Sequence, residues 1–593
     1  MHERAAPRGR PLLLAALLVG ALVLSVVMVR GMFGGGGPRY DVLIVTIDTL
    51  RADAERADMP ALYRLADRGL HCGAARTVVP LTLPAHASLL TGMAPPVHGM
   101  RDNTAAPLPP RKQRDFLTLA EEFQAHGYET AAFVASAVLD KRFGLGAGFS
   151  HYQAPPPPAP GKPRFATLDA SEQVARVREW MAGQRGDSGS DNRPRFVWVH
   201  IWEPHEPYRP YAGDSLHPER TVDTDSPRER YWGEVRRADA ALDAIVRLFD
   251  AERTLIVVVS DHGESLGEHG EKSHGFLTYG ATMDIPLVIA GPGIPAAARP
   301  TPTSILDIAP TLRQLCGFAP RSSDGVSLLA PMESRVLVGE SLYGNRVHNW
   351  AQASVATDGR YSLVDAGARV ELYDRETDPG ETRPIPDPAA HPAYEPLDRA
   401  LLAYQQRKGP AGGGGNPAER GASYTPDSEG NPYYSNYGGA TPYGTVRRPV
   451  GRFLPRAENR KLADPVVSLP VDDEISRMRA AIDMRSGPLV KHLIGRIEEL
   501  ERLHPDDPSP SMARGRALLL VLKRPAEASD ALKEARRRGY RSVGLARMIA
   551  VADAQTLVKA GQTDEAIKLL EATQDKHGED PRIAAQIAAL RKK

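Results

Sequence analysis

Cysteine is the scarcest residue type in this chain. The 593 residues include two cysteines, Cys72 and Cys316, which are too few for a disulfide scaffold and show no C-x-x-C metal spacing. The chain also lacks an excess of either charge, because 74 Lys and Arg residues stand against 73 Asp and Glu residues. This balance excludes nucleic acid as a partner attracted by overall charge. The length predicts two or three folded units joined by linkers.

Long apolar runs are absent apart from one near the N-terminus. Residues 11–29 contain no charged side chain, and as a helix they would span about 28 Å, close to the hydrocarbon thickness of a bilayer. Three arginines within residues 1–10 precede this run, so the positive-inside rule places that tail in the cytoplasm. We predict a single-pass cell-membrane anchor over 11–30, with the rest of the chain on the periplasmic or extracytoplasmic side. A cleaved signal peptide is the alternative, although no A-x-A-like site follows the run.

Beyond a Gly-rich tether at 31–38, short apolar runs alternate with helix-like stretches. The runs are 40–47, 129–135, 195–201, 254–260 and 285–291. Such runs suit strands that are buried on both faces of a sheet. The helix-like stretches include 61–69, 117–127 and 231–249. This alternation predicts an α/β fold with a doubly wound, mostly parallel sheet over residues 39–400.

The composition changes after this domain. Residues 404–460 are rich in Gly, Pro and Tyr and show no hydrophobic period, which predicts a linker. Residues 464–593 are helical in pattern, and 525–535 resembles 563–573 at an offset of 38 residues. This predicts an all-helical domain similar to tetratricopeptide (TPR) repeats that would bind a protein partner, with a plain helical bundle as the alternative.

Three predicted strands end in groups that can bind a cation. Asp48 follows the first strand, and Asp261 and His262 follow the fourth. His200 lies at the end of the third strand. In an open α/β sheet, functional groups gather at the carboxyl ends of the strands. Two carboxylates and an imidazole beside a hydroxyl suit a hard or borderline divalent cation.

The segment TLPAHASLLTG has the pattern of a helix that begins near Thr82. Pro84 suits the first turn, and Gly92 suits the end. The Thr82 hydroxyl would then lie near a helix N-terminus, where the helix dipole favours an alkoxide and an anionic ligand. A free threonine hydroxyl is a poor nucleophile near neutral pH, so we expect a metal ion to activate it.

Six segments, taken in order, resemble the sulfatase branch of the alkaline phosphatase superfamily. They are VLIVTIDTLRAD, LTLPAHASLLTG followed by HGMRDN, HIWEPHEPY, SDHGESLGEHGEKSHG, DIAPTL and ELYDRETDPGE. The likeness covers about residues 39–385 and, with the helical tail, is closest to membrane-anchored members that carry repeats. It implies a metal site formed by four residues, namely Asp48, Thr82, Asp261 and His262.

The resemblance also implies roles around the metal. Thr82 would be the nucleophile, and His205 and His274 would grip the transferred group or assist the leaving oxygen. Asn103 would bind the substrate, unless it only holds a loop. Lys272 is a further candidate for substrate binding and competes with nearby His274. Three other histidines are left open between a supporting and a structural role, namely His86, His200 and His269.

One motif departs from the sulfatases of this family. They carry C-x-P-S-R, whose cysteine is oxidised to formylglycine, whereas this chain has threonine at position 82 and histidine at position 86. Oxidation of a threonine would give a ketone, so no formylglycine is expected. The similar CGAAR at 72–76 lacks the proline and the helix that follows. We therefore predict a metal-dependent hydrolase that cleaves phosphate or sulfate esters through Thr82, with phosphoesters preferred.

The sequence leaves alternatives open for the identity of the metal ion and for the type of reaction. A single ion is expected, because His205 stands where two-metal relatives would carry an aspartate. Zn²⁺ or Mn²⁺ is favoured, with Ca²⁺ and Mg²⁺ as alternatives. The alternative functions are a transferase that moves a phospho-substituent onto envelope lipid or glycan, and a non-catalytic scaffold that presents the helical tail.

Overall fold

A computed structural model gives the structure of most of the chain. It describes residues 39–103, 107–156, 167–183, 193–209, 226–331, 334–348, 350–407, 453–540 and 543–592. The predicted anchor at 11–30 and most of the predicted linker lie outside these residues. Within the described ranges, the structure holds no helix that is both long enough and apolar enough to cross a membrane.

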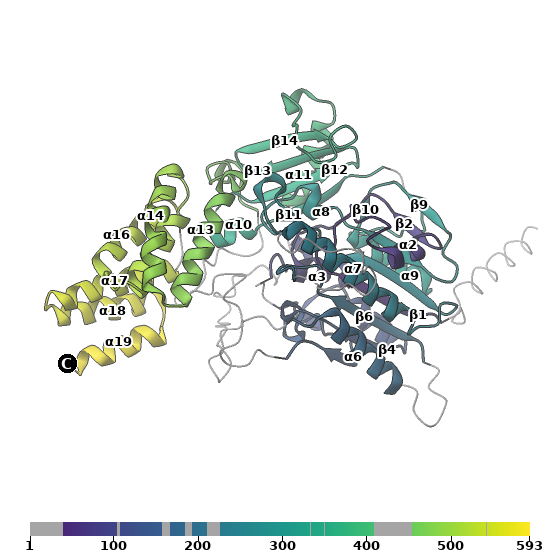
Figure 1. Ribbon diagram of the computed structural model, residues 1–593, viewed down its shortest axis with the longest axis horizontal. Coiled ribbons are helices and arrows are strands. Elements are labelled where there is room, and N and C mark those ends of the chain that lie inside the picture. The colour runs from purple at the N-terminus through teal and green to yellow at the C-terminus, as the bar shows by residue number, and fades with distance from the viewer. Residues whose placement is uncertain are drawn as a thin grey trace, which may run out of the picture.

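An eight-stranded sheet with the order β5-β4-β6-β1-β7-β8-β2-β9 forms the centre of the larger unit (Figure 1). Its strands are β1 (Asp41–Ile47), β2 (Leu70–Cys72), β4 (Glu129–Phe133), β5 (His151–Gln153), β6 (Arg195–Ile201), β7 (Thr254–Ser260), β8 (Leu287–Ala290) and β9 (Ala297–Arg299). β1 pairs in parallel with β6 and β7, whereas β8 is antiparallel to β7 and β2. The predicted α/β fold with a mostly parallel sheet is confirmed.

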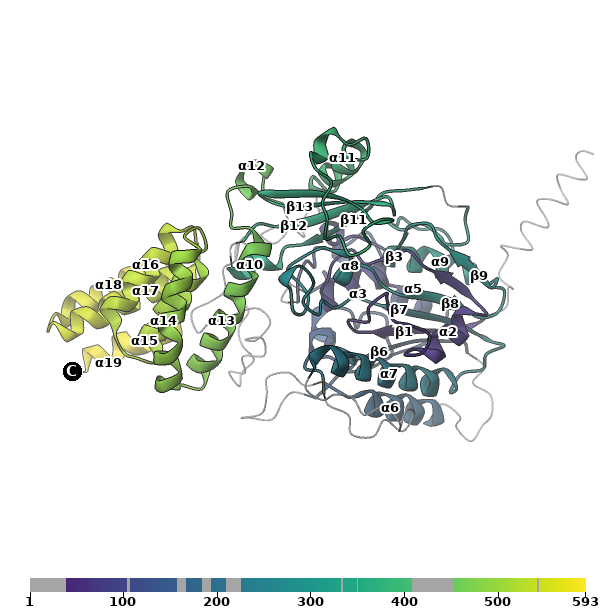
Figure 2. The same cartoon turned by 45° about the horizontal axis from the view of Figure 1, so that its top comes forward.

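β1 lies in the middle of this sheet because it is apolar on both faces. All its residues are buried, as expected for a strand covered on both sides. Val42 and Ile44 belong to one core, and Leu43 and Val45 belong to the other. The first core includes helices α3 (Thr82–Thr91), α5 (Leu119–Ala125) and α9 (Ile308–Leu315). The second includes α2 (Pro60–Ala66), α6 (Ala170–Gly183) and α7 (Pro227–Val246), the last two of which lie below the sheet in Figure 2.

The register of the central strands aligns their carboxyl ends. Ile47 of β1 lies opposite Ile201 of β6 on one side and Ser260 of β7 on the other. Asp48 and Asp261 directly follow β1 and β7, so both side chains emerge at the same edge of the sheet.

A smaller antiparallel sheet packs beside the central one. Its strands are β11 (Leu337–Ser341), β12 (Ala353–Thr357), β13 (Tyr361–Ala366) and β14 (Arg369–Asp374). Helix α11 (Tyr394–Gln405) covers one face through Leu397 and Leu401. The other face contributes Val355 and Val364 to an apolar cluster that continues into the C-terminal helices.

The C-terminal region is helical throughout its described part. Its helices are α13 (Pro465–Asp483), α14 (Gly487–Leu503), α15 (Ser509–Leu520), α16 (Pro525–Arg537), α17 (Val543–Lys559), α18 (Thr563–His577) and α19 (Pro581–Arg591). Successive helices pack on one another around two apolar cores. The all-helical region is confirmed, whereas its likeness to TPR repeats stays a prediction. Figures 1 and 2 both show α13 next to the larger unit.

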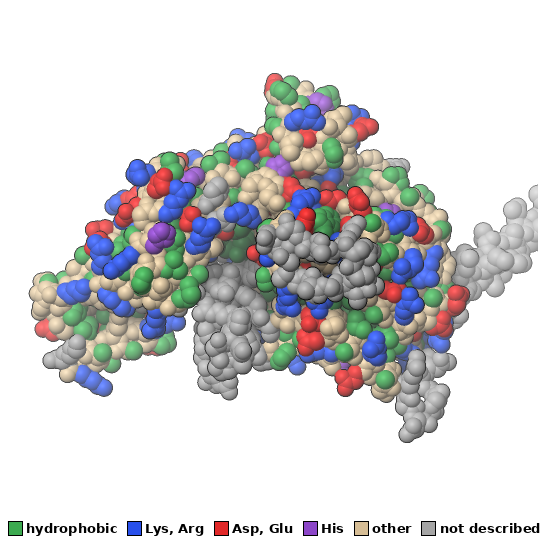
Figure 3. Space-filling model, in the orientation of Figure 1, with side chains coloured by type: hydrophobic (Ala, Val, Ile, Leu, Met, Phe, Trp, Pro, Cys, Tyr) green, Lys and Arg blue, Asp and Glu red, His purple; other side chains and the backbone are tan. Residues whose placement is uncertain are grey.

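Acidic and basic side chains are interspersed on the surface. Figure 3 shows this mixture over both the larger unit and the helical tail. Many of these charges form exposed pairs, such as Arg56 with Asp67 at 2.7 Å. Exposed pairs contribute little to stability, so the buried cores account for most of the stability of the fold.

Candidate active site

Asp48, Asp261 and His262 meet at the carboxyl edge of the sheet. One ligand atom from each lies within 4.8 Å of the others, and all three side chains are buried. Both carboxylate oxygens of Asp48 and Oδ2 of Asp261 lack a hydrogen-bond partner. Buried carboxylates without partners are costly unless a cation compensates them. The three residues therefore fit a divalent metal ion.

His262 presents a free nitrogen to this cluster. Its Nδ1 lies 3.0 Å from the carbonyl oxygen of Gly263, which can only accept, so Nδ1 carries the proton and Nε2 keeps a lone pair. Nε2 lies 3.5 Å from Oδ2 of Asp261 and 3.7 Å from Oδ1 of Asp48. This is the tautomer that a metal-binding imidazole needs.

The two carboxylates are electrostatically unlike in the absence of an ion. Burial, and then the nearby charge of Asp261, raise the pKa of Asp48 well above its ordinary value. Oδ1 of Asp261 accepts hydrogen bonds from the backbone N–H groups of Thr49, at 3.2 Å, and His262, at 2.9 Å. Such bonds favour the ionised form. A cation between the carboxylates would favour ionisation of both.

The chain turns sharply directly after Asp48. Thr49 has a φ of 56°, a left-handed conformation that β-branched residues rarely adopt and that costs about 1–3 kcal/mol. Its carbonyl oxygen accepts a hydrogen bond from the Tyr231 hydroxyl at 2.9 Å, and its N–H donates to Asp261. These contacts hold the strained turn and tie the end of β1 to the end of β7.

Thr82 begins helix α3, as the sequence predicts, and Gly92 ends it with a φ of 72°. The Thr82 side chain is buried, and its Oγ1 lies 3.5 Å from Nε2 of His262. Oδ1 of Asn103 accepts a hydrogen bond from the N–H of Leu83 at 2.9 Å. Asn103 thereby satisfies one of the free donors in the first turn of the helix, next to the predicted nucleophile.

His86 occupies the position of the arginine in C-x-P-S-R and is neutral. Its Nδ1 donates to the carbonyl oxygen of Thr82 at 2.7 Å, so its Nε2 accepts from the hydroxyl of Thr46 at 2.9 Å. The indole N–H of Trp198 donates to the same hydroxyl oxygen at 3.0 Å. Burial lowers the pKa of His86 to about 3. His86 therefore supports the first turn of α3 without adding charge.

His200 also lies beside the carboxylates. Its Nδ1 accepts a hydrogen bond from the N–H of Ala135 at 3.2 Å, so its Nε2 carries the proton in the neutral ring. That nitrogen lies 3.3 Å from Oδ2 of Asp48. His86, His200 and Asp261 are close enough to hold an ion, but both nitrogens of His86 are used in hydrogen bonds to Thr82 and Thr46, and Nε2 of His200 carries a proton.

His274 lies next to His262, and His205 lies next to His274. The ring centroid of His274 lies 4.4 Å from that of His262 and 5.0 Å from that of His205. Nδ1 of His274 lies 3.0 Å from Oε1 of Glu264, and its Nε2 is buried without a hydrogen-bond partner. Burial lowers the pKa of His274 to about 4 and raises the pKa of Glu264 to about 8. The structure thus adds Glu264, which orients His274.

Two of the other predicted residues lie differently. The side chain of Lys272 is exposed, whereas His274 on the same loop is buried. His269 stacks on Tyr279 with ring centroids 3.6 Å apart, and its Nε2 lies 3.2 Å from the carbonyl oxygen of Gly380. His269 is therefore a structural residue of this loop.

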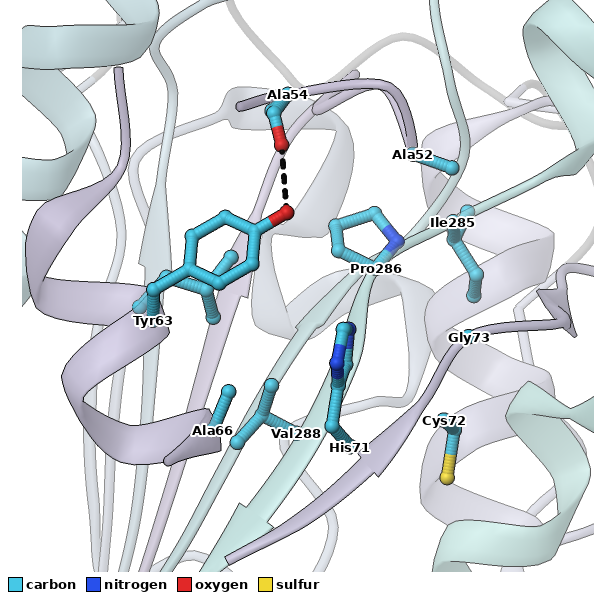
Figure 4. A pocket seen from close by; sticks show the side chains of 11 residues that line it. Ala52, Ala54, Tyr63, Ala66, His71, Cys72, Gly73, Ile285, Pro286 and Val288 are labelled. Atoms are coloured by element: carbon cyan, nitrogen blue, oxygen red, sulfur yellow. Dashed lines mark hydrogen bonds between the residues drawn. The ribbon is translucent and has the colours of Figure 1, made fainter. Parts of the chain in front are cut away.

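A separate hollow of about 30 Å³ lies near β2 (Figure 4). Tyr63, His71, Cys72 and Val288 are among the residues that line it, and the Tyr63 hydroxyl donates to the carbonyl oxygen of Ala54 at 3.0 Å. None of the residues gathered around Thr82 is among its lining residues. Cys72 therefore belongs to a different part of the described structure.

Comparison with known proteins agrees with this geometry. Residues 41–318 match the family model described as Sulfatase. This region is therefore similar to sulfatase-family hydrolases. The sulfatase segment includes the cluster of Asp48, Asp261 and His262, together with Thr82.

The individual proteins that this chain resembles are distant in sequence. A delta 4,5-hexuronate-2-O-sulfatase of Bacteroides thetaiotaomicron is 24% identical over 408 residues, which cover 57% of this chain and 81% of that protein. A choline-sulfatase of Rhizobium meliloti is 35% identical over 171 residues, which cover 27% of this chain and 32% of the relative. The solved structure of a 2-O GAG sulfatase superposes with a TM-score of 0.50 and 21% identity over 62% of this chain and 91% of the other. This likeness shows the fold.

Proposed function

We propose that the sulfatase-family domain hydrolyses phosphate or sulfate esters through Thr82 and prefers phosphoesters. The single observation that supports this most is the buried Thr82 hydroxyl, which faces His262 at a helix N-terminus. A divalent ion held by Asp48, Asp261 and His262 would supply positive charge that favours the ionised hydroxyl and the negative charge of the transition state.

The protein's own groups can complete one displacement. Ionised Oγ1 of Thr82 forms a bond to phosphorus, and the bond from phosphorus to the leaving oxygen breaks. With its pKa raised to about 8, Glu264 is protonated at neutral pH and donates to Nδ1 of His274. The neutral ring of His274 therefore carries its single ring N–H proton on Nε2. The leaving oxygen takes that proton while the proton of Glu264 moves to Nδ1, which leaves a neutral imidazole beside an ionised Glu264. Water then attacks the phosphothreonine from the opposite side, its proton returns to Nε2 as the Nδ1 proton returns to Glu264, and Thr82 is regenerated.

Sulfate esters should react more slowly at the same site. In formylglycine sulfatases, collapse of a hydrated aldehyde expels sulfate, and an alcohol at position 82 offers no such route. The names of the relatives refer to sulfate esters, so both ester classes need to be compared directly.

The experiment that tests this function uses the purified chain with an aryl phosphate, a bis-aryl phosphate, an aryl phosphonate and an aryl sulfate, each with Zn²⁺, Mn²⁺, Ca²⁺ or Mg²⁺. Rapid acid quench and peptide mass spectrometry should find a phosphoryl group on Thr82. Reaction in ¹⁸O-labelled water should place the label in released phosphate. Transfer to an added alcohol would instead indicate a transferase, and turnover without any adduct at Thr82 would contradict the mechanism.

We also propose that residues 11–30 anchor the chain with the hydrolase domain outside the cytoplasm. The support is the uncharged run at 11–29 after an arginine-rich tail. Protease added to intact spheroplasts should then cleave the domain, whereas protection until the membrane is lysed would contradict this orientation.

A further inference from the structure

The C-terminal helices complete an apolar cluster of the hydrolase unit. Leu469 of α13 packs in this cluster with Leu277, Tyr279 and Trp350. Trp350 is 0% exposed, and its indole N–H donates to Oδ2 of Asp507 at 2.8 Å. A large aromatic residue of the hydrolase unit is thus buried with a hydrogen-bond partner from the helical tail.

His348 provides a second anchor next to the first. Its Nε2 lies 2.7 Å from Oδ1 of Asp472 in α13, and its carbonyl oxygen accepts a hydrogen bond from the Ser509 hydroxyl at 3.2 Å. The rings of His348 and Trp350 stack with centroids 4.4 Å apart. Polar groups of the tail therefore hold a pair of stacked rings in the hydrolase unit.

One connection from these rings leads to His274. The ring of Phe276 lies 5.2 Å from that of Trp350 and 5.8 Å from that of His348, measured between centroids. Phe276 follows His274 by two residues, and Gly275 between them has a φ of 107°. A Cβ at Gly275 would lie 3.1 Å from Leu81, so this loop passes close to the residue before Thr82.

A second connection leads to the start of α3. His348 ends helix α10 (Tyr343–His348), and Arg346 of the same helix forms an ion pair with buried Asp102. The next residue is Asn103, whose side chain accepts the hydrogen bond from the N–H of Leu83. The loop that carries His274 and the first turn of α3 are therefore both connected to the rings that the tail holds.

We propose that the helical tail is a docked positioning element of the active site, with Asp507 and Asp472 holding Trp350 and His348 in place. The expected effect on kcat rests on the proposed function, whereas the expected effect on hydrogen exchange does not. Two short routes join the docked rings to His274 and to the first turn of α3. Displacements of about 1 Å in such groups can cost about 10²-fold in rate. The tail therefore acts on catalysis without touching the substrate.

The test uses variants of the full chain. Trp350→Phe keeps a ring but removes the donor, and Asp507→Ala removes the acceptor. Asp507→Asn keeps one of the two acceptor oxygens, which Asp507 uses for the Trp350 indole and for the N–H of Ser509 at 2.8 Å, and should rescue in part. Asp553→Asn is the matched control, because Asp553 pairs with Lys533 within the tail at 3.0 Å. Each variant is measured by hydrogen exchange of peptides covering 99–103 and 271–279, and by kcat and KM on the preferred ester.

We expect Trp350→Phe and Asp507→Ala to speed exchange in both segments and to lower kcat about tenfold with KM within about twofold. Asp507→Asn should fall between Asp507→Ala and the wild type, and Asp553→Asn should behave like the wild type. Wild-type exchange in both test variants would overturn the proposal, and so would faster exchange with unchanged kcat. If the wild type cleaves none of the esters, the proposed function fails, and the exchange measurement alone decides whether the tail holds these segments.

Discussion

Oγ1 of Thr82 lies 3.5 Å from Nε2 of His262, and both side chains are buried. Two atoms that bind one tetrahedral zinc ion at about 2.0 Å each lie about 3.3 Å apart. The distances from the same nitrogen to Asp261, 3.5 Å, and to Asp48, 3.7 Å, are similar. The three oxygens therefore lie from Nε2 of His262 at nearly the spacing that ligands of a single ion require.

Thr82→Ala should abolish turnover while leaving the fold intact. The substitution removes only a hydroxyl and a methyl group, and we expect activity to fall at least about 10³-fold because no nucleophile remains. Thr82→Ser should retain measurable activity and a covalent adduct. Thr91→Val is the control, since Thr91 lies at the other end of α3, where its hydroxyl donates to the carbonyl oxygen of Ala87 at 2.6 Å and accepts from the N–H of Met93 at 3.2 Å. Near-normal turnover by Thr82→Ala would contradict the mechanism.

Metal removal should lower both activity and stability. Without an ion, the buried carboxylates of Asp48 and Asp261 repel each other, so a chelator should reduce Tm. Adding Zn²⁺ or Mn²⁺ at about 100 times its Kd should restore about 2.7 kcal/mol. Differential scanning calorimetry can measure this gain, which should be lost in Asp261→Asn and kept in the exposed control Asp67→Asn. An equal gain in Asp261→Asn would place the ion elsewhere.

Glycine should be a better substitute than alanine at position 49. Both changes delete the Thr49 hydroxyl, which lacks a hydrogen-bond partner in its buried position. Only glycine adopts a φ of 56° without a steric penalty of about 1–2 kcal/mol. Thr49→Gly should therefore have a higher free energy of unfolding than Thr49→Ala in urea titrations. The reverse order would show that the turn is not strained.

Cys72 should remain an unmodified thiol. It is buried in β2 and lines the hollow of Figure 4, and burial raises its pKa to about 12. The thiolate is therefore scarce at pH 8, and iodoacetamide should label Cys72 in urea but not in the folded protein. Tryptic mass spectra should show cysteine at this position. A formylglycine there would contradict the assignment of Thr82 as the nucleophile.

His98 should make the fold sensitive to acid. Burial lowers its pKa from 6.5 to about 3, and its Nε2 donates to the Ser88 hydroxyl while Nδ1 accepts from the N–H of Met100. Because the folded protein binds this proton less tightly than the unfolded chain, the stabilising contribution is present above pH 6.5 and is lost as the pH falls toward 3. The loss should reach about 2 kcal/mol at pH 5.

Urea titrations between pH 7.5 and 5 measure this effect. His98→Asn keeps an acceptor for the Met100 amide and should flatten the dependence of unfolding free energy on pH. The same change at His492, which is exposed on α14, should leave the dependence of unfolding free energy on pH as in the wild type. An unchanged slope in His98→Asn would exclude His98 as the source.

Local patterns were enough to predict the frame of the site. Continuous apolar runs identified β1, β6 and β7, since strands buried on both faces leave such runs. Pro84 and Gly92 marked the ends of α3 closely. The placement of Asp48 and Asp261 at one edge followed from parallel strands alone.

Contacts between distant segments were beyond the sequence patterns. Glu264 orients His274 only because the loop folds back, although its position within DHGE offered a hint. The ion pair of Arg346 with Asp102 and the bond from Trp350 to Asp507 join segments that are more than 150 residues apart. The sheet β11–β14 also escaped prediction, because its short strands are stabilised by pairing and by α11 rather than by long apolar runs.

Because β1 pairs with both β6 and β7, the number of residues in β1 determines where Asp48 lies at the sheet edge. Successive residues of a strand point to opposite faces. Deleting one residue from 41–47 would either reverse every β1 side chain between the two cores or withdraw Asp48 from the sheet edge by about 3.3 Å. Homologous enzymes should therefore tolerate exchanges of one aliphatic residue for another in this strand but no change in its residue count.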